Sequence, residues 1–552
     1  MREIDRLTTE RHAVPSLLLM EAAASASARA VATLFPENFP DIRVLVLCGR
    51  GNNGGDGAAL ARLLWTAGAT VEALLFGRVE ETRGDARTNF EVARQLASAG
   101  DASRLRFLEC PDGGAPWQET RAQMAGYDVL VDALFGTGLS RPLEGVFREA
   151  VAALSSAHEA RAPGESSRPF VVSLDVPSGL DADSARPIGD AVRADLTITF
   201  TAPKPANVLP PASNLNGRLV VAAIGSPDSL VAEAPSELFL TEADDARAWL
   251  RATRYAPDSF KNTHGHALIF AGSRRMTGAA VLTAQAAMRS GAGLVTVASP
   301  ASAAPAVAAR VMPEVMTAGL TETPGGALGR DAFDEAARLL ERADVVAVGP
   351  GLTTDEETRA FVRSVVERRT TPVVIDADGL NCLAPWPAEL RGSAELPLVL
   401  TPHVGEMRRL VGAGDGKSAT TAREASAATD RVALARDFAT AHGLILVLKG
   451  ERTLVAAPDG RAFVNPTGNP GLGTAGSGDT LTGVIAGFIA QSRGAREDRA
   501  DVLAAVLAAL YVGGAAGDLA ARARGVRSMV ASDITERLGA AIRALDPEGE
   551  RP

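Results

Sequence analysis

The residues best suited to chemistry in this sequence lie in two glycine-rich segments, and the clearer of the two is GSGD at 476–479. An apolar stretch with helical spacing follows it, so a helix beginning there would direct free backbone N–H groups at an anion such as a phosphate. Asp479 would lie in the first turn, where a carboxylate can accept a proton from a hydroxyl that attacks a phosphoryl group. A capping aspartate is the simpler alternative, but seven glycines between Gly468 and Gly487 favour a ligand site.

The second segment, GRGNNGGDG at 49–57, joins an apolar strand at 43–48 to a helix that the pattern predicts from about Ala58 to Thr66. Its glycines allow tight turns and close approach by a phosphate or pyrophosphate. No Lys-Ser/Thr pair follows the last glycine and the spacing is not GxGxxG, so neither a P-loop nor the usual dinucleotide fingerprint is present. A strand-to-helix turn with glycines for geometry alone is the alternative.

Several other predicted strands end in polar residues or glycine. Asp132 closes the strand in VLVDALFGTGLSRP, and Asp175 closes the strand in VVSLDVPSGLD. In the second half, Gly351 follows VVAVGP, His403 follows LVLTP, and Lys449 ends LVLK. Each of these could cap a helix, form a turn or lie on the surface. Since ligands bind beyond the carboxyl ends of parallel strands, their repeated occurrence there favours two binding sites.

The elements that must position these residues alternate between short apolar runs and helical stretches, which is typical of α/β domains. The pattern weakens between Gly225 and Asp258, where a domain boundary is expected, giving domains at 1–230 and 240–545. Two long helices are predicted at about 480–492 and 499–521, and a surface loop at 155–169. The two halves show no internal sequence repeat, so they are interpreted as different domains.

Composition narrows the possible partners and location. The formal charge is −10, which argues against nucleic-acid binding because phosphate neutralisation needs clustered Lys and Arg. Three cysteines, Cys48, Cys110 and Cys382, form no zinc-type spacing and no disulfide framework. No stretch is identified as a membrane span or secretory signal, so a cytoplasmic protein without a membrane partner is expected.

In the first half, NNGGDG, DALFGTGL and DVPSG together resemble the NAD(P)H-hydrate epimerase family. The resemblance implies a Rossmann-like three-layer α/β domain that interconverts the R and S hydrates of NADH and NADPH. It implies that Asp132 is the catalytic acid–base, and that Asn53, Asp132 and Ser178 ligate K⁺. The residues implied to bind the hydrate are Asn52, Asn53, Gly54, Gly55, Asp56, Gly136, Thr137, Gly138, Leu139, Ser140, Arg141, Pro142 and Asp175.

The second half, with NPTGNPGLGTAGSGD, DVVAVGPG and LVLKGERT, resembles the ADP/ATP-dependent NAD(P)H-hydrate dehydratase family. The resemblance implies a ribokinase-like three-layer α/β domain that phosphorylates the S hydrate and then eliminates phosphate. Asp479 would be the catalytic base, and Gly351, His403 and Asp479 would contact the hydrate. The implied nucleotide-binding residues are Lys449, Gly450, Glu451, Arg452, Thr453 and Gly478. Mg²⁺ would bridge the phosphates, ADP is favoured over ATP as co-substrate, and a homo-oligomer is expected.

Two alternatives stay open at this point. A ribokinase-like small-molecule kinase with an N-terminal regulatory ligand-binding domain would share the GSGD segment, but it would yield a stable phosphorylated product. The N-terminal half could also be a binding module without activity, although Asn53, Asp132 and Asp175 argue against that interpretation.

Overall fold

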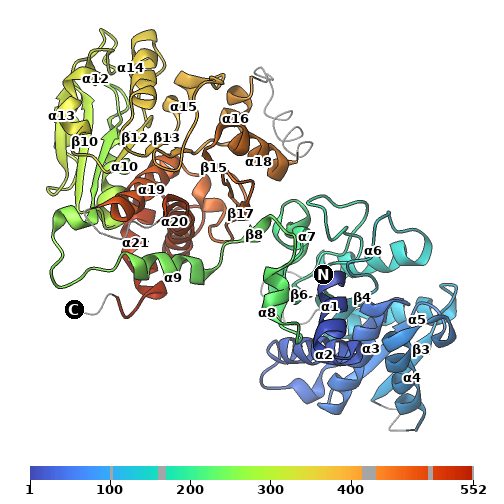
Figure 1. Cartoon of the computed structure of the whole chain (residues 1–552). Helices are drawn as coiled ribbons and strands as arrows, with labels where there is room; N and C mark the ends of the chain where they lie inside the picture. The colour runs from blue at the N-terminus through green and yellow to red at the C-terminus, as the bar shows by residue number, and fades with distance from the viewer. Residues whose placement is uncertain (100–103, 160–168, 413–429, 495–500, 550–552) are drawn as a thin grey trace. The chain divides into compact units, whose positions relative to one another are not determined.

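The computed structural model describes residues 1–99, 104–159, 169–412, 430–494 and 501–549. The chain divides into two compact units, Met1–Pro235 and Ser236–Pro552 (Figure 1). The division falls between the ranges 1–230 and 240–545 expected from the sequence. Each unit is an α/β domain built on one central sheet.

The first unit alternates helices and strands along its length. Its elements are α1 (Arg2–His12), α2 (Ser16–Ala32), β1 (Arg43–Cys48), α3 (Asn52–Thr66), β2 (Thr70–Leu75), α4 (Gly84–Ala99), β3 (Leu105–Glu109), α5 (Ala115–Gln123), β4 (Val129–Ala133), α6 (Gly145–Glu159), β5 (Phe170–Leu174), β6 (Leu196–Phe200), α7 (Pro205–Val208), β7 (Arg218–Ala222) and α8 (Asp228–Ala232).

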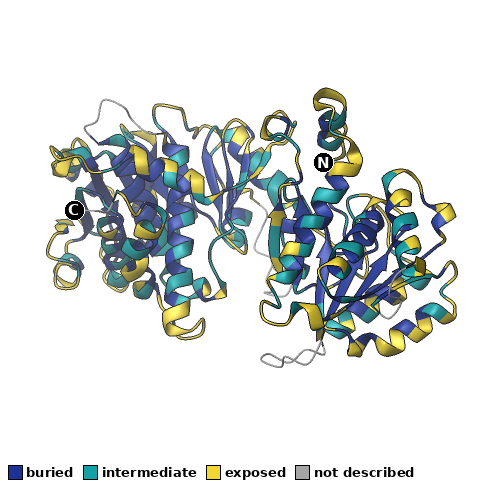
Figure 2. Ribbon diagram, turned by 90° about the horizontal axis from the view of Figure 1, so that it is seen from below, coloured by how far each residue is buried: buried dark blue, intermediate teal, exposed yellow. Residues whose placement is uncertain are grey.

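The seven strands of this unit form one parallel sheet in the order β3-β2-β1-β4-β5-β6-β7. Residues Val44 and Val46 of β1 face a cluster that includes α2, α3 and α4. Leu45 and Leu47 face the opposite cluster with α5 and α6. Because both faces of the central strands are covered, these strands are rich in apolar residues, and Figure 2 shows them buried beneath helices whose outer sides are exposed. The three-layer fold predicted for this half is confirmed.

The second unit has the same alternation with more elements. They are β8 (Leu238–Leu240), α9 (Ala243–Ala252), β9 (His266–Phe270), α10 (Thr277–Arg289), β10 (Leu294–Pro300), α11 (Ala304–Ala308), β11 (Met316–Leu320), α12 (Ala332–Glu335), α13 (Ala337–Leu340), β12 (Val345–Val348), α14 (Glu356–Glu367), β13 (Val373–Ile375), α15 (Asp378–Leu383), β14 (Leu398–Leu400), α16 (Val404–Leu410), α18 (Arg431–His442), β15 (Ile445–Leu448), β16 (Leu454–Ala456), β17 (Ala462–Val464), α19 (Ser477–Arg493), α20 (Val502–Arg524) and α21 (Ala531–Leu545).

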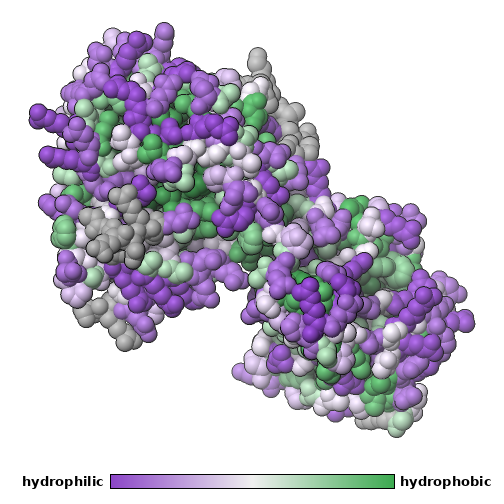
Figure 3. All heavy atoms as spheres, viewed as in Figure 1, coloured by the Kyte–Doolittle hydropathy of each residue, from purple (hydrophilic) through white to green (hydrophobic). Residues whose placement is uncertain are grey.

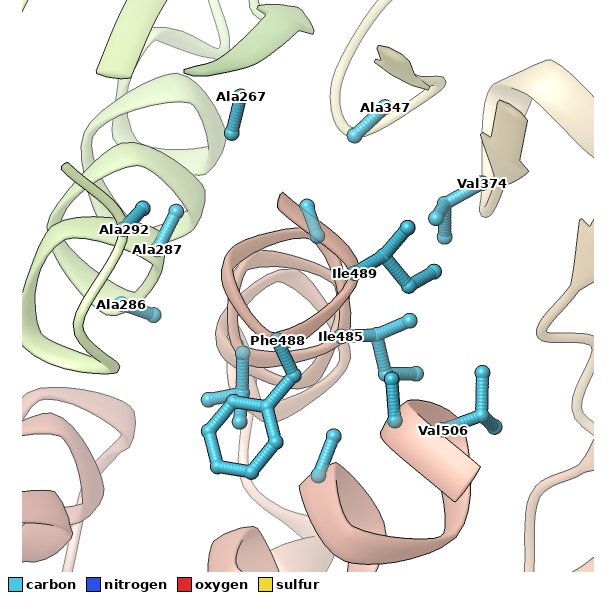
Figure 4. Packing of buried hydrophobic residues seen from close by; sticks show 14 of the residues in the cluster. Ala267, Ala286, Ala287, Ala292, Ala347, Val374, Ile485, Phe488, Ile489 and Val506 are labelled. Atoms are coloured by element: carbon cyan, nitrogen blue, oxygen red, sulfur yellow. The ribbon is translucent and has the colours of Figure 1, made fainter. Parts of the chain in front are cut away.

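Its ten-stranded sheet has the order β11-β10-β9-β12-β13-β14-β15-β16-β17-β8. The pairs from β11 to β15 are parallel, whereas β15–β16 and β16–β17 are antiparallel. One face packs against α10, α19, α20 and α21, with Ile485, Phe488 and Ile489 of α19 among the apolar side chains of the cluster (Figure 4). On the other face, Phe270 of β9 contacts Phe361 of α14 with ring centroids 5.1 Å apart. This half is also a three-layer α/β domain, as predicted.

Helix α19 approaches α10 closely because it has glycine at positions 483 and 487. A Cβ atom on Gly483 would lie 2.1 Å from the Thr283 carbonyl oxygen, and one on Gly487 would lie 2.0 Å from Ser290 Oγ. No side chain fits in that space, so the two glycines fix the distance between the helices. The placement of α19 in turn fixes the position of its first turn, which contains Asp479.

Some sequence-based expectations were wrong in detail. Helix α3 begins at Asn52 rather than near Ala58, since its glycines pack closely in the helix: a Cβ on Gly57 would lie 2.6 Å from the Ala133 side chain. Helix α6 continues to Glu159, so the start of the predicted 155–169 loop is helical, and residues 160–168 lie outside the described residues. Strands β8 and β11 were not predicted, because neither shows a run of buried residues.

Within the part of the chain that the structure describes, one helix is long and apolar enough to cross a membrane by length and composition, which was not predicted from the sequence. It is α20, and 67% of its most apolar window is buried inside the protein. The large apolar side chains that stay exposed, such as Leu18 and Tyr255, come from different elements. Hydrophilic residues cover much of the face in Figure 3.

The close contact between α10 and α19 gives a stability prediction. Gly483→Ala should lower the unfolding free energy of the second unit by about 1–3 kcal/mol, because the added methyl group overpacks a backbone contact. Gly513→Ala in α20 is the matched control, since its Cβ would meet only a Leu481 methyl at 3.8 Å. That control should be neutral or stabilising by up to about 1 kcal/mol. Thermal unfolding of both variants measures the difference, and equal transitions would contradict the prediction.

Candidate functional site

A cavity of about 810 Å³ opens in the first unit at the carboxyl ends of its central strands. It lies where the strand order reverses between β1 and β4, the usual place for a ligand in an open parallel sheet. Most of the residues predicted to bind a ligand in this half line it. These are Asn52, Asn53, Asp56, Gly136, Thr137, Gly138, Leu139, Arg141, Pro142 and Asp175. Gly54, Gly55 and Ser140 belong to the same segments but are not among the lining residues.

A buried ion pair between Asp175 and Lys204 lies in the cavity wall. The Lys204 ammonium donates to Asp175 Oδ1 at 2.5 Å, to Thr199 Oγ1 at 2.8 Å and to the Phe200 carbonyl at 2.9 Å. Lys204 is only 4% exposed, so all three of its N–H donors are used inside the protein. The pair joins the ends of β5 and β6 and holds one carboxylate oxygen of Asp175 in place.

Backbone strain marks the same strand ends. Asp175 has φ 66° and Thr201, just after β6, also has φ 66°. Residues with side chains rarely adopt this left-handed conformation, and where they do, the surrounding structure has to hold them in it. Lys204 was not predicted as a site residue, although it lies shortly after the predicted strand DLTITF, at the sheet edge where ligands bind. The sequence also could not show that Lys204 reaches Asp175.

The second oxygen of Asp175, Oδ2, accepts a hydrogen bond from Thr137 N at 3.3 Å and lies close to Gly136 and Asn53. A Cβ on Gly136 would lie 2.9 Å from Asp175 Oδ2 and 3.4 Å from Asn53 Oδ1. Asn53 is 8% exposed, and neither its Oδ1 nor its Nδ2 has a hydrogen-bond partner. A buried amide without partners is costly, so this point of the wall is suited to a polar ligand or an ion.

Asp132 lies behind the cavity wall rather than in it. It is fully buried and accepts hydrogen bonds from Ser173 Oγ at 2.8 Å, Ser178 N at 2.8 Å, Ser178 Oγ at 2.5 Å and Leu134 N at 3.3 Å. Burial raises the pKa of Asp132, and the hydrogen bonds from Ser178 and Ser173 oppose that rise. The carboxylate thus holds Ser178 firmly, but it is not among the residues that line the cavity.

Two further carboxyl groups in the cavity have raised pKa values. The pKa of Asp56 rises well above its usual range, first because of burial and then because of repulsion by Asp175 and Asp5, with Lys204 opposing. Burial also raises the pKa of Asp5. Arg2, Arg50 and Arg141 line the same cavity. The cavity therefore offers positive groups for an anionic ligand together with carboxyl groups that can carry protons.

In the second unit, Asp479 lies in the first turn of α19, whose N-terminal cap is Gly476 in the left-handed conformation at φ 83°. Burial, followed by repulsion from Asp376, raises the pKa of Asp479 to about 6, and Lys449 opposes the rise. The free N–H groups of the helix terminus and a carboxylate of that pKa lie side by side. This combination suits anion binding next to a general base.

A buried network surrounds this turn. Lys449 Nζ donates to Asp376 Oδ1 at 2.6 Å, and Thr482 Oγ1 donates to Asp376 Oδ2 at 2.7 Å. Burial lowers the pKa of Lys449, but the charges of Asp376 and Glu406 outweigh that effect and the net shift is upward. Lys449 and Asp479 were predicted from the sequence, and VVIDADGLN at 373–381 was interpreted as an apolar strand ending in an Asp-rich loop, but Asp376 was not predicted as a site residue.

Gly351 follows β12 and His403 follows β14, and β13 lies between these two strands in the sheet. Gly351 has φ 67°, and a Cβ there would lie 3.0 Å from the Ala279 side chain. His403 caps α16: its Nδ1 accepts from the N–H groups of Gly405 at 2.9 Å and Glu406 at 3.2 Å. The imidazole is still 56% exposed. Capping, the simpler interpretation of this histidine, is therefore present, and Nε2 lies 3.5 Å from Glu406 Oε1.

The predicted nucleotide-binding residues from Lys449 to Thr453 form the turn between β15 and β16. Arg431 Nη1 donates to the Glu451 carbonyl at 3.0 Å, Arg452 Nη1 donates to the Pro466 carbonyl at 2.6 Å, and Thr453 Oγ1 donates to the Gly450 carbonyl at 3.2 Å. The backbone pairing of His403 with Lys449 brings this turn to the start of α16. Gly478 lies nearby, since a Cβ on it would be 3.4 Å from Lys449 Nζ.

Among the described residues, no group of three or more His, Cys, Asp or Glu side chains is arranged to hold a metal ion. Divalent Mg²⁺ commonly binds through one or two carboxylates together with substrate phosphates and water. Oxygen ligands from Asn and Ser side chains are another kind of site, and the unpartnered Asn53 Oδ1 is such a group.

Comparison with known proteins divides the chain in the same way. Residues 16–206 match the family described as YjeF-related protein N-terminus, and residues 267–539 match the NAD(P)H-hydrate dehydratase family. The bifunctional NAD(P)H-hydrate repair enzyme Nnr of Moorella thermoacetica is 40% identical over 552 residues, covering 100% of this chain and 97% of the relative. The enzyme of the same name from Thermofilum pendens is 37% identical, covering 99% and 96%.

A solved structure is also similar to part of this chain. It is described as ADP/ATP-dependent NAD(P)H-hydrate dehydratase from Bacillus subtilis co-crystallized with ATP/Mg²⁺. It is 30% identical, covers 56% of this chain and 99% of its own, and has a TM-score of 0.46.

The buried pair in the cavity wall gives a stability prediction. Lys204→Met would leave the Asp175 carboxylate buried without its cation, so we expect a loss of about 3–5 kcal/mol. Arg148→Met is the control, because Arg148 pairs with Asp190 at the surface, where the two side chains are 66% and 56% exposed. That control should cost about 0–1 kcal/mol. Hydrogen exchange of the β5 and β6 amides measures both losses, and similar protection in the two variants would contradict the prediction.

Proposed function

The chain belongs to the family of bifunctional NAD(P)H-hydrate repair enzymes, and from that premise we propose how its two units divide the chemistry. It is an NAD(P)H-hydrate epimerase and an NAD(P)H-hydrate dehydratase. The observation that carries this function is the match over the full chain to relatives of that name, at up to 40% identity among those compared. A small-molecule kinase with a regulatory domain is not favoured, because the same relatives span both units.

The first unit, in our proposal, is the epimerase and the second is the dehydratase. The cavity of the first unit has a carboxylate facing its interior and arginines in its wall, which suit a phosphate-bearing dinucleotide. The second unit places a helix terminus and a general base together, as a kinase-like step requires. Because a dehydratase acting on one epimer leaves the other behind, an epimerase on the same chain lets the whole hydrate pool be repaired.

Asp175 is the residue proposed to exchange a proton with the hydrate. Inversion at the carbon that bears the hydroxyl requires a bond at that carbon to break and form again, so a proton has to be given and taken back. Asp175 lines the cavity, with Oδ1 held by Lys204 and Oδ2 facing Asn53. Asp132 was predicted for this role from the sequence. Its enclosed position favours an indirect one instead, in which it holds Ser178, whose hydroxyl accepts from the N–H group of the cavity residue Phe135 at 2.9 Å.

K⁺ is proposed to bind at Asn53, Asp132 and Ser178. The residues fit such an ion because they offer amide, carboxylate and hydroxyl oxygens, and because Asn53 Oδ1 is buried without a partner. A bound cation would supply positive charge next to the cavity and satisfy that oxygen. The other predicted residues at 52–56 and 136–142 would then surround the dinucleotide.

Asp479 is proposed as the base of the dehydratase. Its carboxylate takes the proton of the hydrate hydroxyl while the hydroxyl oxygen attacks the terminal phosphoryl group of the nucleotide, and the bond from that phosphorus to the leaving nucleotide breaks. The phosphate ester then loses phosphate, and a proton leaves the adjacent carbon, which restores the ring double bond. Gly351 and His403 are proposed to contact the hydrate, at strand ends close to this turn.

The nucleotide is proposed to bind at Lys449, Gly450, Glu451, Arg452, Thr453 and Gly478. ADP is the proposed co-substrate, with ATP as the alternative, and Mg²⁺ would be held mainly by the phosphates. Lys449 Nζ lies beside the first turn of α19, where it can meet the same phosphates as the helix N–H groups. A cytoplasmic homo-oligomer, with no nucleic-acid or membrane partner, completes the proposal.

The epimerase proposal is tested with a mixture of R and S NADPH hydrates, Mg²⁺ and either ADP or ATP, followed by the absorbance of the reduced nicotinamide. The unmodified chain should convert the whole mixture beyond the rate of spontaneous epimerisation. Asp175→Asn should convert the S fraction and then proceed at a much lower rate, because its carboxamide cannot carry the proton and enzymatic epimerisation is slower by about 10²–10⁴-fold. Asp128→Asn is the control, since Asp128 accepts from Arg43 N at the opposite sheet edge. Conversion of the R fraction by Asp175→Asn as fast as by the unmodified chain would disprove the assignment.

The dehydratase proposal makes a prediction about pH. Asp479 must be deprotonated to act, and its pKa is raised to about 6, so the rate should fall as the pH drops through about 6 and reach a plateau above it. Asp479→Asn should lose about 10²–10⁴-fold in rate at every pH. Asp533→Asn is a matched control, because Asp533 holds the third helical position of α21 as Asp479 does in α19. Stopped-flow rates on S hydrate measure these effects, and an active Asp479→Asn variant would rule out the proposed base.

A further inference from the structure

Asp376 is a buried carboxylate to which the function proposed above assigns no task. It directly follows β13 and is 1% exposed. Each of its oxygens accepts one hydrogen bond, Oδ1 from Lys449 Nζ at 2.6 Å and Oδ2 from Thr482 Oγ1 at 2.7 Å. It therefore ties the end of β15 to the first turns of α19.

The donors come from the two elements that the proposed nucleotide site uses. Thr482 lies one turn after Asp479 in α19, and Lys449 begins the turn between β15 and β16. A Cβ on Gly478 would lie 3.4 Å from Lys449 Nζ and 3.7 Å from Asp376 Oδ2. The ammonium group is thus held within van der Waals distance of the first turn of α19.

We infer that Asp376 is a positioning residue of the dehydratase reaction, which holds the Lys449 ammonium group at the N-terminal end of α19, where the nucleotide phosphates are proposed to bind. This inference rests on the function proposed above. A lysine side chain has a flexible four-carbon stem, so without a fixed partner its charge would be spread over many positions. The hydrogen bond to Asp376 Oδ1 restricts the ammonium group to one position.

A purely structural role explains the arrangement less well. A buried ion pair adds little net stability over apolar residues of similar size, because both charges lose their hydration. The side chains of β13 itself, Val373, Val374 and Ile375, are apolar and fully buried. A charged pair in this place has a clearer use in orienting a cation toward an anionic ligand than in holding the sheet together.

Asp376 also acts on Asp479 through its charge. After burial, repulsion by Asp376 contributes most to the raised pKa of Asp479, Asp378 adds to it, and Lys449 opposes it. Glu406 of α16 acts on Lys449 in turn. Loss of the Asp376 charge should therefore lower the pKa of the base as well as release the lysine.

Asp376→Asn tests both effects with readouts that a general loss of stability would not produce. The Kd for ADP, measured by calorimetry in the presence of Mg²⁺, should rise by about tenfold or more, which corresponds to about 1.4 kcal/mol. The acid limb of the rate profile on S hydrate should move to lower pH. Asp344→Asn is the control, because Asp344 accepts from His266 N at the amino end of β9, and both readouts should stay as in the unmodified chain.

A double-variant cycle with Lys449→Met tests the pathway of the effect. If Asp376 acts through Lys449, the double variant should bind ADP no more weakly than Lys449→Met alone. Strictly additive losses, or an unchanged Kd and acid limb in Asp376→Asn, would overturn the inference.

If Asp376→Asn does not fold, the Thr482→Val variant provides the test, since it removes one hydrogen bond to Asp376 and keeps every charge. A weaker ADP affinity would support the inference and an unchanged affinity would overturn it.

Failure of the underlying proposal has a different signature. An Asp479→Asn variant that still dehydrates the hydrate would remove the proposed base, whatever the ADP affinity of Asp376→Asn. An inactive Asp479→Asn together with unchanged ADP binding in Asp376→Asn would leave the proposed base intact and overturn only the positioning role.

Discussion

A lysine ammonium group held against a buried aspartate carboxylate organises the carboxyl edge of the sheet in each unit. The Asp175–Lys204 pair has its two atoms 2.5 Å apart, and the Asp376–Lys449 pair has them 2.6 Å apart. Removing two charges from water costs several kcal/mol per ion unless their geometry is well fixed. Each site therefore depends on a surrounding fold that is rigid enough to hold the lysine and the aspartate at this distance.

That frame comes from strands buried on both faces and from helices that pack closely on them. In the second unit, Gly483 and Gly487 let α19 reach the backbone of α10, which sets where the helix begins. In the first unit, Gly57 brings α3 against the Ala133 side chain at the end of β4. The glycines of both segments therefore allow close packing of a helix and also leave space for a ligand to approach the backbone.

The two pairs are used differently. In the first unit, Lys204 holds Asp175 Oδ1 at 2.5 Å and Oδ2 accepts a longer hydrogen bond of 3.3 Å from Thr137 N, so the cavity-lining aspartate is itself the group proposed to react. In the second unit, Asp376 is 1% exposed and its oxygens accept from Lys449 and Thr482, so the carboxylate proposed to react is a separate residue, Asp479. An isomerase needs one group that gives and recovers a proton. A phosphoryl transfer needs a base and a fixed cation as two distinct groups.

The sequence by itself determined the alternation of strands and helices, the two α/β domains, the glycine-rich segments and the candidates Asp132, Asp175, Lys449 and Asp479, because these depend on local patterns and short motifs. It did not reveal Asp376 or Lys204 as site residues, and it did not show that Asp132 lies behind the cavity wall. Asp376 and Lys449 are separated by 73 residues, so only strand order and the packing of α19 bring them together. The tertiary structure decided which carboxylate oxygens pair with a lysine and which carboxylates line a cavity, because burial and charge pairing join residues across the sheet rather than along the chain.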